Sequence, residues 1–166
     1  MIVRFRGTRG SIPAALTALD VREKVTAALL AARGKELRSE GQIRKFVQDE
    51  LPFHISGTCG GHTPCVQIET GSDEYLVFDG GSGIRSLGQE IMSTGPGSKT
   101  VHIFISHLHY DHIQGIPFFT PAYIPGNKII FHGGHDNLQE SLSRHMEAPY
   151  FPINTDTMGA ELIYEK

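Results

Sequence analysis

The sequence predicts an α/β protein in which helices and strands pack as layers. Short runs of β-branched and aromatic residues, such as Val101–Ile105 and Tyr75–Phe78, are typical of buried strands. Segments with apolar residues at helical spacing lie between these runs, and this alternation favours a layered α/β architecture. A chain of 166 residues suits one domain, 1–166, that buries about 68 to 70% of its unfolded surface.

Composition and charge are those of an ordinary globular protein. Hydrophobic residues make up 39% of the chain, charged residues 20%, and the net charge is -3. Because no basic patch stands out, recognition of a nucleic acid or nucleotide would have to be local. The sequence shows no charged-then-apolar leader and no apolar run near the ~20 residues that cross a bilayer, so we expect a cytoplasmic protein without a membrane segment.

The chain begins with a predicted strand, Met1–Phe5, and then a turn. Gly7–Pro13 reads Gly-Thr-Arg-Gly-Ser-Ile-Pro, and its glycines and proline force the backbone to bend. Such a loop, with free backbone N–H groups and Arg9, can bind an anion. The alternative is a plain turn with Arg9 in solvent.

Residues 14–52 lose the strand pattern and gain a helical one. A first helix is predicted to have Asp20 as its cap and to end at Gly34. Its apolar face is formed by Val21, Val25, Ala28, Leu29 and Ala32. A second helix is predicted from the capping box of Ser39 and Gln42 and ends before the proline at the end of the segment. Since each helix has one apolar face, we expect the two to pack on each other or on the sheet.

The remainder of the chain predicts further strands and helices in alternation. The expected strands are Cys65–Glu69, Tyr75–Phe78, Val101–Ile105, Lys128–His132 and Leu162–Tyr164. The expected helices run from the glycine-rich loop after Asp79 to about Ser93 and from a cap at Asp136 and Gln139 to about Met146. A short helix is also expected to start within His112–Phe118, in a segment that Pro117, Pro121 and Pro125 keep irregular.

The two cysteines, Cys59 and Cys65, are expected to be buried free thiols in a reducing compartment. A zinc site of Cys59, His62 and Cys65 is the alternative, but the cysteines lack the C-x2-C spacing of such sites. Histidines outside the motif described next are expected to have ordinary structural roles: His54, His102, His132, His135 and His145.

The most informative stretch follows the strand Val101–Ile105, where the chain continues as Ser-His-Leu-His-Tyr-Asp-His. In extended backbone, residues two apart point the same way, so His107 and His109 can face one point. Asp111 and His112 follow a bend and can face a second point. Imidazole and carboxylate are ligands for zinc, manganese or iron, and two ions ~3.5 to 4 Å apart can activate water. The alternative, a histidine-rich polar turn, arises by chance about once in a thousand such chains.

These residues, with Ser106 before them and 113–119 after, resemble the signature of the metallo-β-lactamase superfamily. The likeness is greatest to its phosphodiesterase branch, which includes ribonuclease Z and phosphonate-pathway phosphodiesterases. Gly7–Pro13 resembles the opening loop of that branch. Gly60–Val66 resembles its Gly-Gly-Asn-Thr-Ser-Cys-Val stretch, with His62 in place of the asparagine and Pro64 in place of the serine.

The resemblance implies the N-terminal part of an αββα sandwich with 14–52 as a helical insertion at the rim of the site. That insertion would be a lid or substrate wall, or else a packing or oligomer contact. The implied activity is hydrolysis of a small-molecule or nucleotide phosphodiester by a hydroxide bridging two divalent ions, most simply zinc.

The resemblance also assigns site residues. His107 and His109 would bind one ion, while Asp111, also the catalytic residue, and His112 would bind the other. Asp79 would hold a histidine from behind, although a helix or turn cap is the competing interpretation. The implied phosphate and pocket contacts are Thr8, Arg9, Ser11 and His62.

Three further ligands of the family pattern, a histidine for the first ion and a bridging aspartate and final histidine for the second, are expected beyond residue 166. Asp156 comes too early to be the bridge, and no histidine follows His145. The expectation is therefore a chain truncated before those ligands, one completed by another chain or a second copy, or a non-catalytic relic that acts by oligomerisation or partner binding. Thioester or lactam hydrolysis is the other enzymatic alternative, because the motif does not select the substrate.

Overall fold

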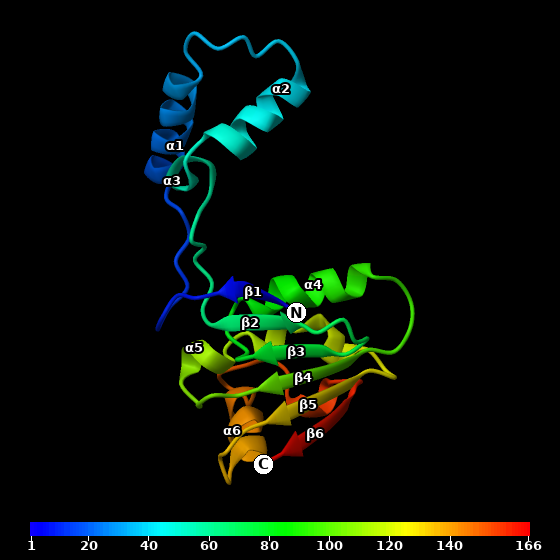
Figure 1. The fold of residues 1–166 in the computed structure, drawn as a ribbon. Helices are drawn as coiled ribbons and strands as arrows, with labels where there is room; N and C mark the ends of the chain where they lie inside the picture. Colours follow the sequence, from blue (N-terminus) through cyan, green and yellow to red (C-terminus); the bar gives the residue numbers. More distant parts are fainter. The chain divides into compact units, whose positions relative to one another are not determined.

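A computed structural model describes all residues, 1–166, and divides them into two compact units. The first comprises 1–14 and 61–166, and the second comprises 15–60. The first unit is built on one six-stranded sheet with the strand order β1-β2-β3-β4-β5-β6 (Figure 1). The strands are β1 (Ile2–Gly7), β2 (Cys65–Glu69), β3 (Tyr75–Phe78), β4 (Thr100–Phe104), β5 (Lys128–His132) and β6 (Glu161–Glu165). The predicted α/β class is confirmed.

The sheet is antiparallel at one side and parallel at the other. β2 and β3 pair antiparallel, as the short connection at 70–74 predicts, and β1 also pairs antiparallel with β2. From β3 to β6 all neighbours run parallel. All predicted strands are present. Those at 65–69, 75–78 and 128–132 match to the residue, and the others shift by one or two residues at their ends.

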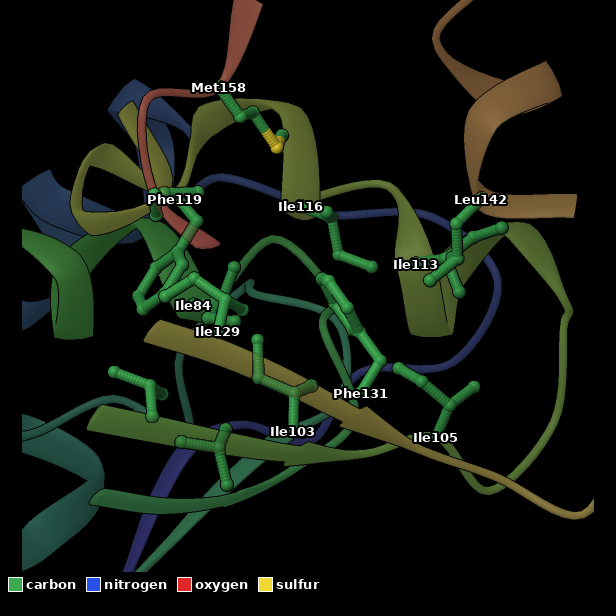
Figure 2. Close-up of a cluster of buried hydrophobic side chains, with 14 of the residues drawn as sticks. Ile84, Ile103, Ile105, Ile113, Ile116, Phe119, Ile129, Phe131, Leu142 and Met158 are labelled. Carbon is green, nitrogen blue, oxygen red and sulfur yellow. The ribbon is translucent and has the colours of Figure 1, made fainter. Parts of the chain in front are cut away.

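The main core lies on one face of the sheet. Val101 and Ile103 of β4 and Ile129 and Phe131 of β5 alternate into it and are almost fully buried. The helix α4 (Ile84–Ser93) covers this face with Ile84, Leu87 and Ile91, and α6 (Leu138–His145) covers it with Leu138 and Leu142. Figure 2 shows the β4 and β5 side chains directed toward Ile84, Ile116 and Phe119. Burial of this face is the main force that forms the unit.

The opposite face of the sheet is apolar but more exposed. Val3 and Phe5 of β1 and Phe78 of β3 are 45%, 71% and 41% exposed. His102 and His132 also alternate onto this face and form a hydrogen bond of 2.9 Å between Nδ1 and Nε2. The first unit is thus one sheet with helices packed on one face.

The segment after β4 differs from its prediction in where its helix lies. It contains α5 (Tyr110–Ile113) and then the 3-10 turns η2 (Ile116–Phe118) and η3 (Thr120–Tyr123). The predicted short helix is present, but it begins two residues earlier and ends at Ile113. The prolines keep the segment after it irregular, as predicted.

The predicted cap of α6 is also wrong. The helix begins after Asn137, which makes no side-chain capping bond. The Asp136 carboxylate instead pairs with Lys166 at the end of the chain. Asp136 thus pairs with a residue 30 positions away in sequence and does not cap the helix, which sequence spacing alone does not reveal. A further short turn, η4 (Thr155–Thr157), precedes β6.

The second unit, 15–60, is helical. It contains α1 (Ala18–Ala31), α2 (Glu40–Lys45), the π-turn η1 (Phe46–Glu50) and α3 (Phe53–Ser56). The capping box of Ser39 and Gln42 is confirmed. The predicted cap of α1 is wrong: Thr17 is the N-cap, and Asp20 is its capping-box partner at the third position.

The apolar face predicted for α1 is not buried within this unit. No residue of α1 is buried, and Val21, Val25 and Leu29 remain about half or more exposed. The helix is held to the α3 segment through the Lys24 ammonium, which donates to the carbonyl oxygens of His54 and, at 2.6 Å, Gly57. The interpretation of this unit as an insertion remains a prediction.

No helix in the structure combines the length and the apolar character that crossing a membrane requires.

Candidate metal centre

The motif residues lie at the carboxyl edge of two adjacent parallel strands. β3 and β4 pair in register, with Phe78 opposite Phe104, so the residues that follow each strand emerge side by side. The Asp79 N–H donates to the carbonyl of Phe104 at 2.9 Å, which fixes this edge. Loops at the carboxyl ends of parallel strands are the usual location of sites in α/β proteins.

Three imidazoles gather immediately after β4. The ring centroids of His107 and His109 are 4.4 Å apart, and those of His107 and His112 are 4.0 Å apart. Leu108, between the first two histidines, packs against the core. The extended backbone therefore sends the leucine inward and brings both histidines together, as the alternating spacing predicts.

Asp79 is the hub behind these histidines. Its carboxylate accepts hydrogen bonds from the Ser106 backbone N–H at 2.9 Å and from the Ser106 hydroxyl at 2.8 Å, and its Oδ2 lies 2.8 Å from His112 Nδ1. The side chain is only 12% exposed, so these donors offset the cost of removing a carboxylate from water. Asp79 has a φ of 62°, which aspartate tolerates better than most residues.

The hydrogen bonds assign the tautomers of two histidines. A carboxylate can only accept, so His112 must carry its proton on Nδ1. The single Ser106 hydroxyl proton goes to Asp79, so Oγ accepts from His107 Nδ1, 3.1 Å away. In the neutral rings, Nε2 of His107 and of His112 is left with a free lone pair, which is the form that binds a metal.

Asp111 completes the cluster. Its Oδ2 accepts the Ser11 backbone N–H at 2.7 Å and lies 3.6 Å from His112 Nε2. The Ser11 N–H is the main reason that the pKa of Asp111 is lowered below its usual value. The carboxylate is therefore ionised, as a metal ligand must be.

Of the loop residues predicted to contact substrate, Thr8 and Arg9 use their backbone N–H groups within the protein, whereas the side chains of Arg9 and His62 are exposed. Thr8 and Arg9 direct their backbone N–H groups to the carbonyl of His62, at 3.0 and 2.9 Å, so these two donors are not available to an anion. The Arg9 side chain is exposed and forms no ion pair. The exposed His62 ring lies 3.2 Å from the Ser82 hydroxyl through Nδ1.

Two glycines allow the loops to approach one another. A Cβ on Gly81 would lie 2.4 Å from the Asp111 carbonyl oxygen and 2.5 Å from that of Pro64. A Cβ on Gly115 would lie 2.0 Å from the carbonyl oxygen of Gly81. The loop after β3 thus packs directly on the backbone of the motif, where no side chain fits.

The imidazole and carboxylate groups of this cluster suit a transition metal, but the structure does not bring three of them around one point. No three His, Cys, Asp or Glu side chains are grouped so that they could hold one ion between them. The chemistry fits nonetheless: imidazole nitrogens with carboxylate or hydroxyl partners behind them and an ionised carboxylate are ligands for zinc, manganese or iron. His107 with His109, and Asp111 with His112, would each provide two of the three or four protein ligands of a typical site.

The cysteine predictions are only partly correct. Cys65 is fully buried, and burial raises the pKa of its thiol to about 12, whereas Cys59 is exposed. The prediction that both thiols are buried is therefore wrong for Cys59, because the loop that carries it belongs to the helical unit. The alternative zinc site with His62 is not formed.

Ser106 is the contributor that sequence reasoning did not assign. The sequence signal is slight, since a serine after a strand is common, and its role depends on Asp79 approaching from the neighbouring strand. Ser11 has a contact that the sequence did not indicate, since its N–H donates to the predicted ligand Asp111. Its assignment as a phosphate contact stays a prediction.

Comparison with known proteins supports the family resemblance. The chain is 29% identical over 116 residues to ribonuclease Z from Haloarcula marismortui, a match that covers 63% of this chain and 36% of that protein. It is 38% identical over 73 residues to ribonuclease Z from Porphyromonas gingivalis, covering 40% and 23%, and 46% identical over 44 residues to that from Haloferax volcanii, covering 26% and 13%. The matches thus span little more than a third of the length of the first relative. No family model and no solved structure matches the chain.

Proposed function

We propose that this chain carries part of a metal-dependent centre that hydrolyses phosphodiester bonds, with RNA as the substrate class. The observation that carries the proposal is the Asp79 and Ser106 hub, which ties Nδ1 of His107 and His112 and leaves their Nε2 atoms free. A structural histidine cluster has no need for such an arrangement, whereas a metal ligand does. The similarity to three proteins named ribonuclease Z supports the choice of phosphodiester and of RNA.

His107 and His109 would hold one divalent ion, and Asp111 and His112 a second. Zinc is the first choice, with manganese and iron as alternatives. When bound, such ions lower the pKa of water and stabilise charge on phosphoryl oxygens. Asp79 acts through His112: its carboxylate faces the Nδ1 N–H, fixes the orientation of the ring and makes the Nε2 lone pair a stronger metal ligand.

The exposed side of the loop supplies the substrate contact in this proposal. The Arg9 guanidinium is free of ion pairs and can face a phosphate. The Thr8 side chain and the His62 ring are exposed on the same pair of hydrogen-bonded loops. Since Thr8 and Arg9 already use their backbone N–H groups, side chains and not a backbone nest would make this contact.

A second candidate is a non-catalytic module that acts by oligomerisation or partner binding. The open apolar face with Val3, Phe5 and Phe78 favours it, because apolar patches on a sheet mark association surfaces. The two candidates differ in whether the motif binds metal.

Metal binding and hydrolysis separate these candidates. The full chain is stripped with chelator and titrated with Zn²⁺ or Mn²⁺, and bound metal is measured by competition with a chromophoric chelator. Hydrolysis of bis-p-nitrophenyl phosphate and of a short RNA is followed alongside a thioester and a lactam. The variants are His107→Ala and His112→Ala, and His54→Ala is the matched control because His54 is an exposed histidine in the helical unit.

We expect metal binding by the wild type and by His54→Ala, weakened at least about tenfold in the two motif variants, together with cleavage of a phosphodiester. Less than a tenth of a metal ion per chain and no turnover would reject the hydrolase for this chain and favour the module. Turnover of only the thioester or the lactam would refute the choice of phosphodiester.

A further inference from the structure

We propose that the loop before the helical unit positions the metal ligand Asp111 through a single backbone group, the N–H of Ser11. This inference rests on the proposed function, since it concerns how that centre is held. It assigns to 8–11 a structural role in the metal site that is distinct from any contact with substrate.

The hydrogen bond engages one carboxylate oxygen only. Ser11 N–H donates to Asp111 Oδ2 at 2.7 Å, a short distance typical of a charge-assisted bond. No other residue donates a hydrogen bond to Oδ1. The bond therefore fixes the rotation of the carboxylate and leaves one oxygen for an ion, which is the role that outer partners of carboxylate ligands have in metal sites.

The loop is built to aim this N–H. Its start is held by Thr8 and Arg9, which both donate to the carbonyl of His62, and the Ile12 N–H closes a tight turn onto Gly10 at 2.8 Å. Ser11 itself lies in the left-handed region with a φ of 60°. A non-glycine residue is strained in that region, and a hydrogen bond to a charged group is stronger than one between neutral groups, so the bond to Asp111 can offset the strain.

The contact between Ser11 and Asp111 joins two distant segments of the chain. Ser11 and Asp111 are a hundred residues apart, and the serine is exposed, so core packing does not require its conformation. The strained backbone is explained by the carboxylate that it contacts.

Three substitutions at one position test the assignment. Ser11→Ala removes the hydroxyl and keeps the N–H, and Ser11→Gly keeps the N–H and also allows the observed φ. Ser11→Pro removes both the N–H and the φ of 60°, which proline cannot adopt, so the amide measurement below separates these two effects. Each variant is titrated with Zn²⁺ and with Co²⁺, whose visible absorption reports coordination geometry, and thermal unfolding is recorded without metal.

We expect the alanine and glycine variants to bind within about threefold of wild type. The proline variant should bind at least about tenfold more weakly and show an altered Co²⁺ spectrum. Equal affinity and equal spectra for all three would overturn the proposal, as would a loss in Ser11→Ala as large as in Ser11→Pro, since the hydroxyl would then be the group that matters.

A second measurement needs neither metal nor a variant at Ser11. In the metal-free wild type, the Ser11 amide proton should resonate downfield and exchange slowly with solvent, and Asp111→Ala should remove both properties. If the wild type binds no metal, the proposed function fails, while this amide still decides whether Ser11 holds Asp111. A fast-exchanging amide that Asp111→Ala leaves unchanged would refute the contact.

Discussion

The Asp79 hub makes a quantitative prediction for the substitution Asp79→Asn. Asparagine has the same shape and tolerates the φ of 62° as well as aspartate does, so the change isolates the charge. The amide oxygen can still accept from Ser106, but the amide NH₂ would face the N–H of His112 Nδ1, so that two hydrogen-bond donors meet. Relieving that conflict requires the His112 proton to move to Nε2, and a charge-assisted hydrogen bond is lost, at about 2 kcal/mol.

Urea unfolding in chelator, followed by tyrosine fluorescence, measures this loss. All five tyrosines lie between residues 75 and 164, so the signal reports the sheet unit alone. Asp136→Asn is the control, because its side chain is 88% exposed and the change should stay within about 0.5 kcal/mol. Imidazole ¹⁵N shifts should show His112 protonated on Nδ1 in wild type and on Nε2 in the variant.

Since a protonated Nε2 cannot bind an ion, Asp79→Asn should also weaken metal binding by about tenfold to a hundredfold. A variant that unfolds within about 0.5 kcal/mol of wild type and keeps the Nδ1 proton would refute the assignment of Asp79 as the hub.

Three further predictions test other parts of the molecule. Gly81→Ala should destabilise the sheet unit by about 3 kcal/mol in urea unfolding, because its Cβ would meet two backbone carbonyls; Gly134→Ala, which meets no atom within 4 Å, should be nearly neutral, and equal effects would contradict the close approach. Burial raises the pKa of Cys65 from 9.0 to about 12, so its stabilising contribution is complete below pH 9 and is lost as the pH rises toward 12. Between pH 9 and 10.5 the free energy of unfolding of wild type should fall by about 2 kcal/mol more than that of Cys65→Ala. A thiol reagent should label only Cys59 in the folded chain. Rapid labelling of both thiols, or the same pH dependence of stability in wild type and variant, would be inconsistent with burial. Replacement of 15–60 by a short Gly-Ser linker should leave the tyrosine-monitored unfolding intact, because the Ala14 N–H and the Gly61 carbonyl already meet at 2.8 Å, and a shortened chain that does not fold would show that the helical unit is required.

Local features of the chain were readable from sequence because they depend on neighbours along it. The strand at 128–132 follows from its β-branched and aromatic run, and the capping box at Ser39 and Gln42 from its spacing. The approach of His107 and His109 follows from the two-residue period of extended backbone.

The predictions from sequence were wrong where a residue interacts with a group far away in the chain, or where another local feature determines the structure. Asp136 pairs with Lys166 instead of capping α6. The short helix expected to start within 112–118 instead starts at Tyr110, and 3-10 turns follow it. Cys59 and Cys65 differ in burial because they lie in different units.

The sequence by itself determined that an α/β chain would deliver His107, His109, Asp111 and His112 to the end of a buried strand, since strand propensity and side-chain alternation are local properties. Only the tertiary structure decided how these groups are held. Parallel pairing of β3 and β4 brings Asp79 behind Ser106 and His112, and a loop a hundred residues away places the Ser11 N–H on Asp111. Hydrogen bonds between segments so far apart depend on folded geometry, which no spacing within the motif encodes.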